Sequence, residues 1–572
     1  MTQQVVAGGW KARLARIAPG LASLLGYRAA WFTDDLRAGV SVAAVALPVA
    51  VAYAELAGFH PVTGLYACIL PMLVYALFGT SRQLIVGPDA ATCALLAAAV
   101  MPLAGGDPGL YLSLALTLTF LTGLFCMAAS FLRLGALAEF LSRPILVGFL
   151  NGVALSILLG QLGKIFGFSM EEGGILPRSV ELFAKFELWH WPTIAVSALA
   201  LLVMLLAQRF VPKLPAALLA MLAAGLAVAG LGLEAQGVAS IGAVPAGLPE
   251  LHVPSFPLEL LPTLLADAAG LALVSFSSMM LTAQSFAEKN GYSVDADREF
   301  MALGLANIAS SASQGFAISG ADSRTAVADS SGGRSQLCGV IAALAIALVL
   351  LFFTAPLAYV PLAALGVVLV FGAMSLVNLS FLGELYRISR SEFALSILAT
   401  LGVVAVGAIQ AILLVVILAL LRFVRAMSRP QVEELGKVEG MRGVHSLGRH
   451  ADARRYPGLY LFRFNAPIVF FNAQYFRREV RAAMERGGPQ LRWFVIDMLP
   501  VTMVDASGFY VLRELVAEMV ERGITPVMAG RLTEWERWYE RSGVQAAAEV
   551  RRFPTLRQVL RAYQAEQEAV VQ

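Results

Sequence analysis

Apolar residues recur along the first three quarters of the chain in runs separated by short polar or glycine-rich turns. A helix that crosses a bilayer needs about 20 mostly apolar residues, and these runs fit that length. The pattern therefore predicts a polytopic α-helical membrane protein with 14 transmembrane segments in two sets of seven. The predicted segments are 38–57, 62–79, 84–103, 110–132, 144–166, 192–210 and 214–232, followed by 261–286, 299–313, 320–331, 335–354, 361–378, 392–407 and 408–427.

The same pattern divides the chain into four parts. Residues 1–37 are basic and are predicted to lie along the cytoplasmic surface, residues 38–429 to form the transmembrane domain, residues 430–455 to form a polar linker, and residues 456–572 to form a soluble domain. An even number of spans places both termini on one side, and the Lys and Arg residues flanking the outermost spans place that side in the cytoplasm. We expect an inner (plasma) membrane protein with both termini and the C-terminal domain in the cytoplasm.

Residues 456–572 show the patterns of a soluble α/β domain. The predicted strands are Leu459–Phe464, Ile468–Phe471, Trp493–Met498 and Pro526–Ala529, and the predicted helices are Asn472–Arg486, Ser507–Arg522 and Pro554–Ala569. Ser507 is a residue type that often caps a helix, and we expect it to cap the second of these helices.

The composition agrees with a membrane protein and excludes several classes of protein. The chain is 58% hydrophobic and 14% charged, with a mean hydropathy of +0.73, which excludes an ordinary soluble protein. The net charge of +3 gives no reason to expect a nucleic-acid partner. The five histidines lack metal-ligand spacing and the four cysteines lie in apolar stretches, so neither a metal site nor a disulfide is expected. No nucleophile–base pair or nucleotide loop is visible, so we expect neither an enzyme nor a cofactor.

One polar stretch, Gly315–Asp329, lies among the apolar segments of the second set. It contains Asp322, Ser323 and Arg324, and ionisable residues at membrane depth usually mark the path of a substrate or ion. Gly320 separates a short extended piece from a run that is compatible with a helix. A helix that begins in the middle of the membrane presents unpaired N–H groups and a positive dipole end, which together bind anions.

The first set has a counterpart at Leu84–Thr92. Four residues suited to a strand lead there into Pro88, and proline is favoured at the first position of a helix. Two interrupted segments at corresponding positions of two halves are the sequence pattern of a transporter site at the membrane midplane. The hypothesis is that two half-helix N-termini face each other across one anion.

Several motifs resemble those of the SulP sulfate permease family of anion transporters. They are Ala52–Gly58, Pro61–Tyr66, Ser81–Ala90, Ser285–Tyr292 and Ser323–Val327. The C-terminal region is similar to a STAS domain through Trp493–Asp497 and Asp505–Gly508. The resemblance implies seven-plus-seven inverted repeats, divided into a core and a gate domain and often assembled as a homodimer.

The resemblance also implies where the anion binds. The family's site lies between the amino ends of the third and tenth helices, with an aromatic residue from the first. Carried over to this chain, the substrate-binding residues are Tyr53, Asp89, Ala90, Gly320, Ala321, Asp322, Ser323 and Arg324. Tyr53 rests on the resemblance alone, whereas the half-helix argument points independently to the third and tenth helices.

The eighth helix departs from the family pattern. Many members carry an acid there, which in some belongs to a cation site, whereas this chain has Ser278 with Thr282 one turn on. Sodium coupling is therefore less expected than proton coupling, in which an acid at the site takes the proton. The candidates for that acid are Asp89, Asp322 and Glu55. Two alternatives stay open: Asp322 pairs with Arg324 and only holds the loop, or Arg324 bonds loop carbonyls instead of substrate.

The predicted function is a secondary active anion transporter, working by proton symport and an elevator-like movement of core against gate. An uncoupled channel or exchanger of the same fold is the alternative. A membrane-anchored STAS signalling protein is less favoured, because Ala506 stands where related signalling proteins carry a phosphorylatable serine. The expected partners are a small inorganic or organic anion, a proton, the lipid bilayer and a second copy of the chain. Sulfate, bicarbonate, chloride and small dicarboxylates all suit such a site.

Overall fold

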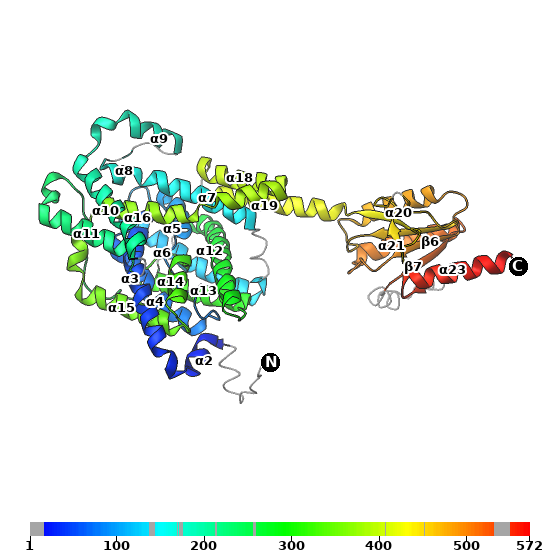
Figure 1. Ribbon diagram of the computed structural model, residues 1–572, viewed down its shortest axis with the longest axis horizontal. Coiled ribbons are helices and arrows are strands. Elements are labelled where there is room, and N and C mark those ends of the chain that lie inside the picture. The colour runs from blue at the N-terminus through cyan, green and yellow to red at the C-terminus, as the bar shows by residue number, and fades with distance from the viewer. Residues whose placement is uncertain are drawn as a thin grey trace. The chain divides into compact units, whose positions relative to one another are not determined.

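The structure is a computed structural model that describes residues 17–135, 143–168, 170, 175–211, 214–254, 259–406, 408–450, 452–530 and 550–571. The chain forms two compact units, Met1–Ile417 and Leu418–Gln572. Figure 1 shows that the first is a bundle of helices and the second a sheet flanked by helices.

The first unit contains helices and two very short strands. The elements before the middle of the chain are α2 (Pro19–Leu25), η1 (Ala29–Trp31), α3 (Phe32–Leu56), α4 (Pro61–Phe78), β1 (Val86–Gly87), α5 (Ala90–Ala104), α6 (Pro108–Phe131), α7 (Arg143–Gly160), α8 (Leu162–Phe166), α9 (Ile175–Ala184), η3 (Phe186–Leu188), α10 (Trp191–Phe210), α11 (Ala216–Leu231) and η4 (Leu233–Gln236). The later elements are α12 (Leu261–Lys289), α13 (Ala296–Ala312), β2 (Ser319–Gly320), α14 (Asp322–Ser330), α15 (Leu337–Phe352), η5 (Ala355–Tyr359), α16 (Leu362–Leu376), α17 (Leu379–Ile388), α18 (Arg390–Ala405) and α19 (Ala408–Ser428), the last of which continues into the second unit.

Seven helical stretches among the described residues are long and apolar enough to cross a membrane, not the fourteen predicted. They are Ala29–Leu56, Pro61–Phe78, Pro108–Phe131, Arg143–Phe166, Trp191–Phe210, Leu261–Lys289 and Leu362–Ile388. Each predicted range does contain a helix, but several of these helices are short. For α5 and α14 the interruption is the physical reason, because they begin only after β1 and β2 have used part of each segment and so have 15 and 9 residues. α11 and α15 are uninterrupted but have only 16 residues each.

The helices of the first unit pack in two sets. The first helix set is α3, α4, α5, α6, α12, α13, α14 and α15, and the second helix set is α7, α8, α10, α11, α16 and α18. Small residues allow close approach at Gly148 and Gly152 of α7, where an added Cβ would lie 2.1 and 2.8 Å, respectively, from carbonyl oxygens of α18. Figure 1 shows α7 and α18 side by side. The two sets meet where α3 contacts α16 and α11, and where α5 contacts α7.

The second unit is a six-stranded mixed sheet with the order β4-β3-β5-β6-β7-β8. Its strands are β3 (Val432–Gly436), β4 (His445–Ser446), β5 (Leu459–Phe464), β6 (Trp493–Asp497), β7 (Thr525–Ala529) and β8 (Arg551–Phe553), and its helices are α20 (Ala473–Gly487), α21 (Ala506–Glu521) and α23 (Leu556–Val571). The strands from β5 to β8 pair in parallel, and β3 and β4 extend the sheet in antiparallel fashion. Side chains of α20 and α21 pack against one face, and side chains of α23 against the other.

Three details of this unit differ from expectation. Residues 432–436 and 445–446, in the predicted linker, form strands at the edge of the sheet. The predicted strand Ile468–Phe471 makes only an isolated bridge, from Ile468 to Val504. The cap of α21 is Asp505 instead of Ser507, because the helix begins one residue earlier than predicted and the Asp505 carboxylate accepts a hydrogen bond from Gly508 N at 2.8 Å.

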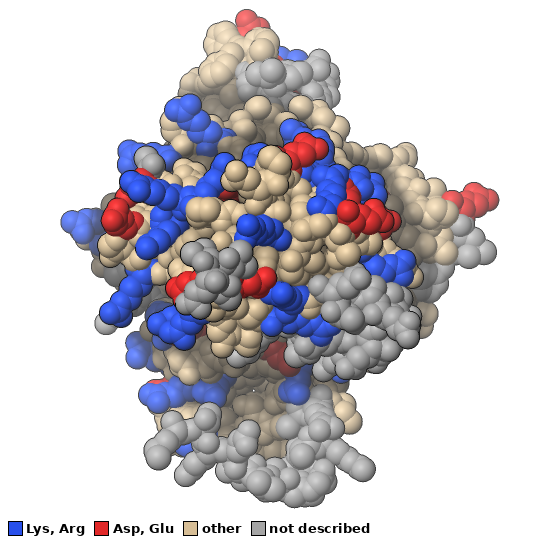
Figure 2. Space-filling view, turned by 90° about the vertical axis from the view of Figure 1, so that its right-hand side faces the viewer, with Lys and Arg blue, Asp and Glu red and all other residues tan. Residues whose placement is uncertain are grey.

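Lys and Arg side chains are prominent on the face shown in Figure 2, with fewer Asp and Glu among them. In the second unit, several arginines are paired with carboxylates. Three arginines of α20 and of the turn after α21 bind carboxylates of α21, in the pairs Arg477–Glu514, Arg481–Glu518 and Arg522–Glu518. The first two ion pairs link α20 to α21, the helices that cover one face of the sheet, and the third joins α21 to the turn that follows it.

Candidate functional site

The two interrupted segments meet as a small antiparallel sheet. Val86 pairs with Gly320 and Gly87 with Ser319, so β1 and β2 lie side by side although they come from opposite halves of the first unit. Each strand leads directly into a helix, α5 or α14. A further bond extends the pairing, because Ala321 N donates to Ile85 O at 2.8 Å. This arrangement brings the N-termini of α5 and α14 together, as the sequence predicted.

Buried polar side chains hold β2 in place. The Ser275 hydroxyl of α12 donates to Ile318 O at 2.8 Å, and the Ser319 hydroxyl donates to Ser275 O at 2.7 Å. Asn307 of α13 accepts a hydrogen bond from Ile318 N at 3.0 Å. Gly320 is required by close approach, since a Cβ there would lie 3.0 Å from the Cα atom of Met279. Because the backbone groups of Ile318 find partners on neighbouring helices, irregular chain is tolerated inside the bundle.

The first turns of the two half-helices differ. The N-cap of α5 is Asp89, whose carboxylate accepts a hydrogen bond from Thr92 N at 3.5 Å. The N-cap of α14 is Ala321, which has no side chain able to cap. Asp322 follows it, and its carboxylate accepts a short hydrogen bond from the Thr282 hydroxyl of α12.

Arg324 connects α14 to the other half of the site. Its guanidinium donates a short hydrogen bond to Pro88 O and approaches Cys68 Sγ at 3.6 Å, and the side chain is 1% exposed. Its Nε atom is buried and has no hydrogen-bond partner among the described residues. Gly87 makes room for it, since a Cβ on Gly87 would lie 2.5 Å from Arg324 Nη1. Arg324 therefore bonds a loop carbonyl in this structure, while one N–H group remains unused.

A cavity of about 770 Å³ lies at these helix ends. The sequence-predicted residues that line it are Tyr53, Asp89, Ser278, Thr282, Ala321, Asp322, Ser323 and Arg324. Ala90, Gly320 and Glu55 are not lining residues. Ala90 is buried at the start of α5, and Glu55 forms an ion pair with Lys164, with 2.9 Å between Glu55 Oε1 and Lys164 Nζ. The cavity therefore brings together most of the predicted site.

Comparison with known proteins identifies the family. The model of the Sulfate permease family matches residues 32–399, and that of the STAS domain matches residues 450–559. A probable sulfate transporter of Mycobacterium tuberculosis is 40% identical over 531 residues, which cover 92% of this chain and 93% of that protein. The chain belongs to the sulfate permease family. It is thus a multi-pass membrane anion transporter with a C-terminal STAS domain, and not an enzyme.

A more distant relative is also similar in sequence, and two solved structures are similar in fold. Probable sulfate transporter 4.2 of Arabidopsis thaliana is 31% identical and covers 86% of this chain and 75% of its own length. The structure of murine Solute Carrier 26 family member A9 anion transporter in the inward-facing state has the same fold, with a TM-score of 0.89 at 21% identity over 99% of this chain and 96% of that one. The transmembrane domain of a cyanobacterium bicarbonate transporter matches 69% of this chain and 98% of its own, with a TM-score of 0.60 at 24% identity.

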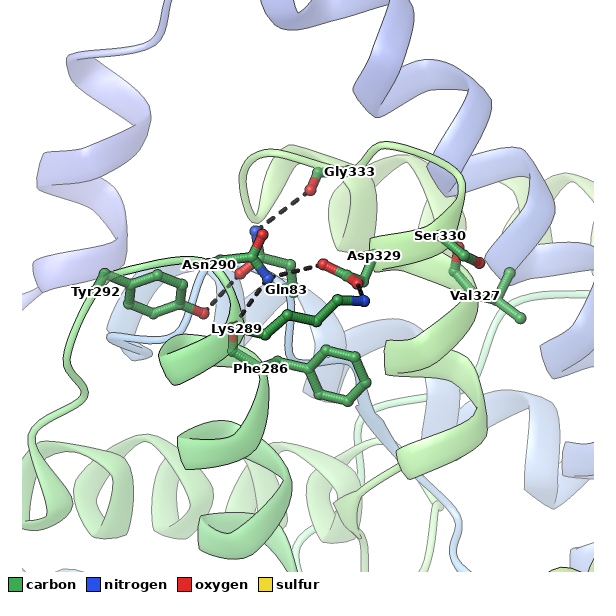
Figure 3. A network of polar contacts seen from close by, with 9 residues as sticks. All are labelled: Gln83, Phe286, Lys289, Asn290, Tyr292, Val327, Asp329, Ser330 and Gly333. Carbon is green, nitrogen blue, oxygen red and sulfur yellow. Dashed lines mark hydrogen bonds and ion pairs between the residues drawn. The ribbon is translucent and has the colours of Figure 1, made fainter.

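The sulfate permease motif Ser285–Tyr292 begins at the cavity, which Ser285 and Glu288 line, and its last residues lie beside the site. Figure 3 shows Lys289 and Asn290, at the end of α12, binding the two carboxylate oxygens of Asp329 at 2.6 and 2.8 Å. Tyr292 donates to Gln83 Oε1 at 2.6 Å. These bonds tie the end of α12 to α14 and to the loop that leads into β1. The motif thus fixes both interrupted segments to one helix.

Several polar or charged residues that line the cavity of this sulfate permease were not predicted from the sequence. They are polar or charged side chains at the ends of ordinary helices, namely Arg143 of α7, Gln284, Ser285 and Glu288 of α12, and Ser375 of α16. No interruption of an apolar run marks these positions. Arg143 stacks over the Phe381 ring of α17 at 5.1 Å, which fixes its charge near the cavity.

Proposed function

We propose that this protein is a secondary active transporter that carries sulfate together with a proton. The observation that supports this proposal is the pairing of β1 with β2, which aims two helix N-termini at one cavity. Backbone N–H groups and the positive dipole ends favour an anion there. Arg324, whose Nε has no hydrogen-bond partner among the described residues, adds a positive charge beside the cavity. Sulfate is the first candidate because the relatives described above are probable sulfate transporters.

The charge of the cavity favours a proton as the coupled ion. Its ionisable carboxylates are Asp89, Asp322 and Glu288, against the guanidinium groups of Arg143 and Arg324. With all groups ionised the lining would repel an anion, and protonation of a carboxylate removes that repulsion. We assign the proton to Asp322, because its carboxylate bonds only a neutral hydroxyl among the described residues and faces the cavity.

We further propose that the first helix set is the core and the second the gate of a seven-plus-seven inverted repeat. Corresponding interrupted segments that pair in antiparallel fashion are what such a repeat produces. The lining residues lie at the start of α7 and the ends of α12 and α16, so the cavity opens at that end. With the predicted orientation, in which both termini and residues 456–572 are cytoplasmic, this mouth faces the cytoplasm. The transporter would work as a homodimer by an elevator-like movement of core against gate.

The test is transport by the purified, full-length protein in liposomes with a clamped membrane potential. Radiolabelled sulfate, bicarbonate and a dicarboxylate are each followed with and without an inward proton gradient. Accumulation of sulfate above its equilibrium level only with the gradient is expected. Rapid equilibration that the gradient does not change would contradict coupling and would indicate an uncoupled channel or exchanger. Accumulation of another anion in place of sulfate would contradict the substrate assignment.

A further inference from the structure

An ion pair lies between α3 and α8, outside the cavity. Glu55 Oε1 is 2.9 Å from Lys164 Nζ, and the two side chains are 14% and 30% exposed. The second oxygen of the carboxylate, Oε2, is buried and has no hydrogen-bond partner among the described residues. The carboxylate is therefore largely withdrawn from water, and the ammonium group of Lys164 is the cation that compensates it.

The position of the pair is opposite to the cavity mouth. On α7, the lining residues Arg143, Leu146 and Leu150 all lie in the first half of the helix, whereas Lys164 lies in α8, beyond the end of α7. On α16, the lining residues lie in the last turns, whereas Lys164 packs near Gly366, close to the start of that helix. A Cβ on Gly366 would lie 3.5 Å from the Cβ of Lys164. The pair therefore lies at the closed end of the pathway.

The pair also joins the two helix sets. α3 packs against α4, α14 and α15 of the first helix set, and α8 packs against α7, α10 and α16 of the second. If the two sets move relative to one another, Glu55 and Lys164 must separate before the closed end can open. We propose that the Glu55–Lys164 ion pair holds this end of the pathway shut and that each transport cycle breaks it. The inference rests on the proposed movement of core against gate.

The state that is favoured when Glu55 or Lys164 is removed follows from the solvation of the remaining charge. A charge that loses its partner in a partly buried place is left uncompensated, which is unfavourable. Opening the closed end would expose that charge to water and relieve the penalty. Removing either partner therefore shifts the population toward the state that is open at this end. Exchanging the two charges restores the attraction and reverses the shift.

A matched control is available within the first helix set. Lys289 and Asp329 form an ion pair of 2.6 Å, seen in Figure 3, which joins α12 to α14. Because both helices belong to the same moving body, breaking this pair leaves the barrier between the two sets unchanged. Lys289→Gln therefore removes a cation from an ion pair without altering access from the closed end.

The experiment measures access to the cavity from each face of the membrane. Ser278, which lines the cavity, is replaced by cysteine as a reporter in the full-length protein, and the four native cysteines are buried. Right-side-out and inside-out membrane vesicles are treated with a membrane-impermeant maleimide, and the protein without the reporter gives the background. Glu55→Gln and Lys164→Gln are each expected to raise the labelling rate from the closed face about tenfold, whereas Lys289→Gln leaves it unchanged.

The charge exchange, Glu55→Lys with Lys164→Glu, separates the ion pair from simple misfolding. It is expected to return the labelling rate to within about twofold of the starting protein. Single variants that label at the starting rate, or a well-folded exchange variant that is not restored, would overturn the proposal. Labelling needs neither sulfate nor a proton gradient. Unchanged labelling in a protein that accumulates sulfate therefore refutes only the ion-pair proposal, and shifted labelling without accumulation refutes only the proposed function.

Discussion

The two half-helices α5 and α14 have the same architecture but different chemistry. Each follows a strand of two residues, and the strands pair with each other. In α5 the carboxylate of Asp89 is the N-cap and bonds the backbone of its own helix. In α14 the cap is Ala321, and the carboxylate of Asp322 bonds a hydroxyl on α12. The carboxylate of Asp89 therefore caps its own helix, whereas the carboxylate of Asp322 bonds a neighbouring helix at the cavity.

The cation of the site shows the same asymmetry. Arg324 lies in the first turn of α14 and donates across to Pro88, in the loop before α5. The corresponding position of α5 is Thr92, whose hydroxyl donates to the backbone carbonyl of Asp89, the N-cap of the same helix, at 3.0 Å. α14 therefore supplies the cation that bonds across to the loop before α5, and in the proposed function it also supplies the acid that takes the proton.

The largest effect is expected at Arg324. Arg324→Ala removes the donor to Pro88 O and the charge beside the cavity, so the initial rate of sulfate uptake in liposomes should fall about a hundredfold. Arg324→Lys should recover little, because an ammonium group lacks the planar fork that reaches both Pro88 and Cys68. Uptake by the lysine variant within about threefold of the original would show that charge alone suffices.

The next effect separates the two acids. Asp322→Asn should abolish proton-driven accumulation while sulfate still equilibrates, because the amide keeps the contact with Thr282 but takes no proton. Asp89→Asn should preserve accumulation, since asparagine is an equally good N-cap. Both are measured by sulfate uptake with and without the proton gradient. The opposite result, with accumulation lost only in Asp89→Asn, would assign the proton to α5.

The sequence pointed to α14 because Gly320, Asp322 and Arg324 interrupt an apolar run, and ionisable residues at membrane depth usually mark the path of a substrate or ion. Charge placement of this kind is local, so it is visible in the sequence alone. The partners of these residues are not local. Asn307 and Ser275, which hold β2, lie in regular helices where a single polar residue gives no sign of its partner.

The same reason explains what the sequence analysis missed elsewhere. Glu55 and Lys164 are far apart in the chain, and each alone resembles a charge near a helix end. Residues 432–436 resemble a linker because the first three of them are only partly buried, and because on one side their strand pairs only with β4, a strand of two residues. The predicted boundaries of the short helices came from the length of apolar runs, and an apolar run does not reveal where a strand ends and a helix begins.

A smaller effect compares two threonines of the half-helices. The Thr325 hydroxyl accepts a hydrogen bond from Ile85 N at 3.0 Å, so Thr325→Val would leave a buried N–H group without its partner. Such a loss costs about 1–3 kcal/mol, which should appear as a lower melting temperature in detergent. Thr92→Val is the matched control, because the Thr92 hydroxyl bonds only its own helix, and it should cost less than about 0.5 kcal/mol. Equal losses of stability at the two positions would show that the hydrogen bond between Ile85 N and the Thr325 hydroxyl adds nothing.

The smallest effect tests the cap of α5 itself. Asp89→Ala removes the side-chain acceptor for Thr92 N, and loss of an N-cap costs about 0.5–2 kcal/mol. The distance of 3.5 Å is at the limit of a hydrogen bond, so the low end of that range is expected. The melting temperature in detergent measures this, with Asp89→Asn as the variant that retains the cap. If Asp89 serves only its own helix, its alanine variant should lose a little stability yet still accumulate sulfate with the gradient, which Asp322→Asn should not do.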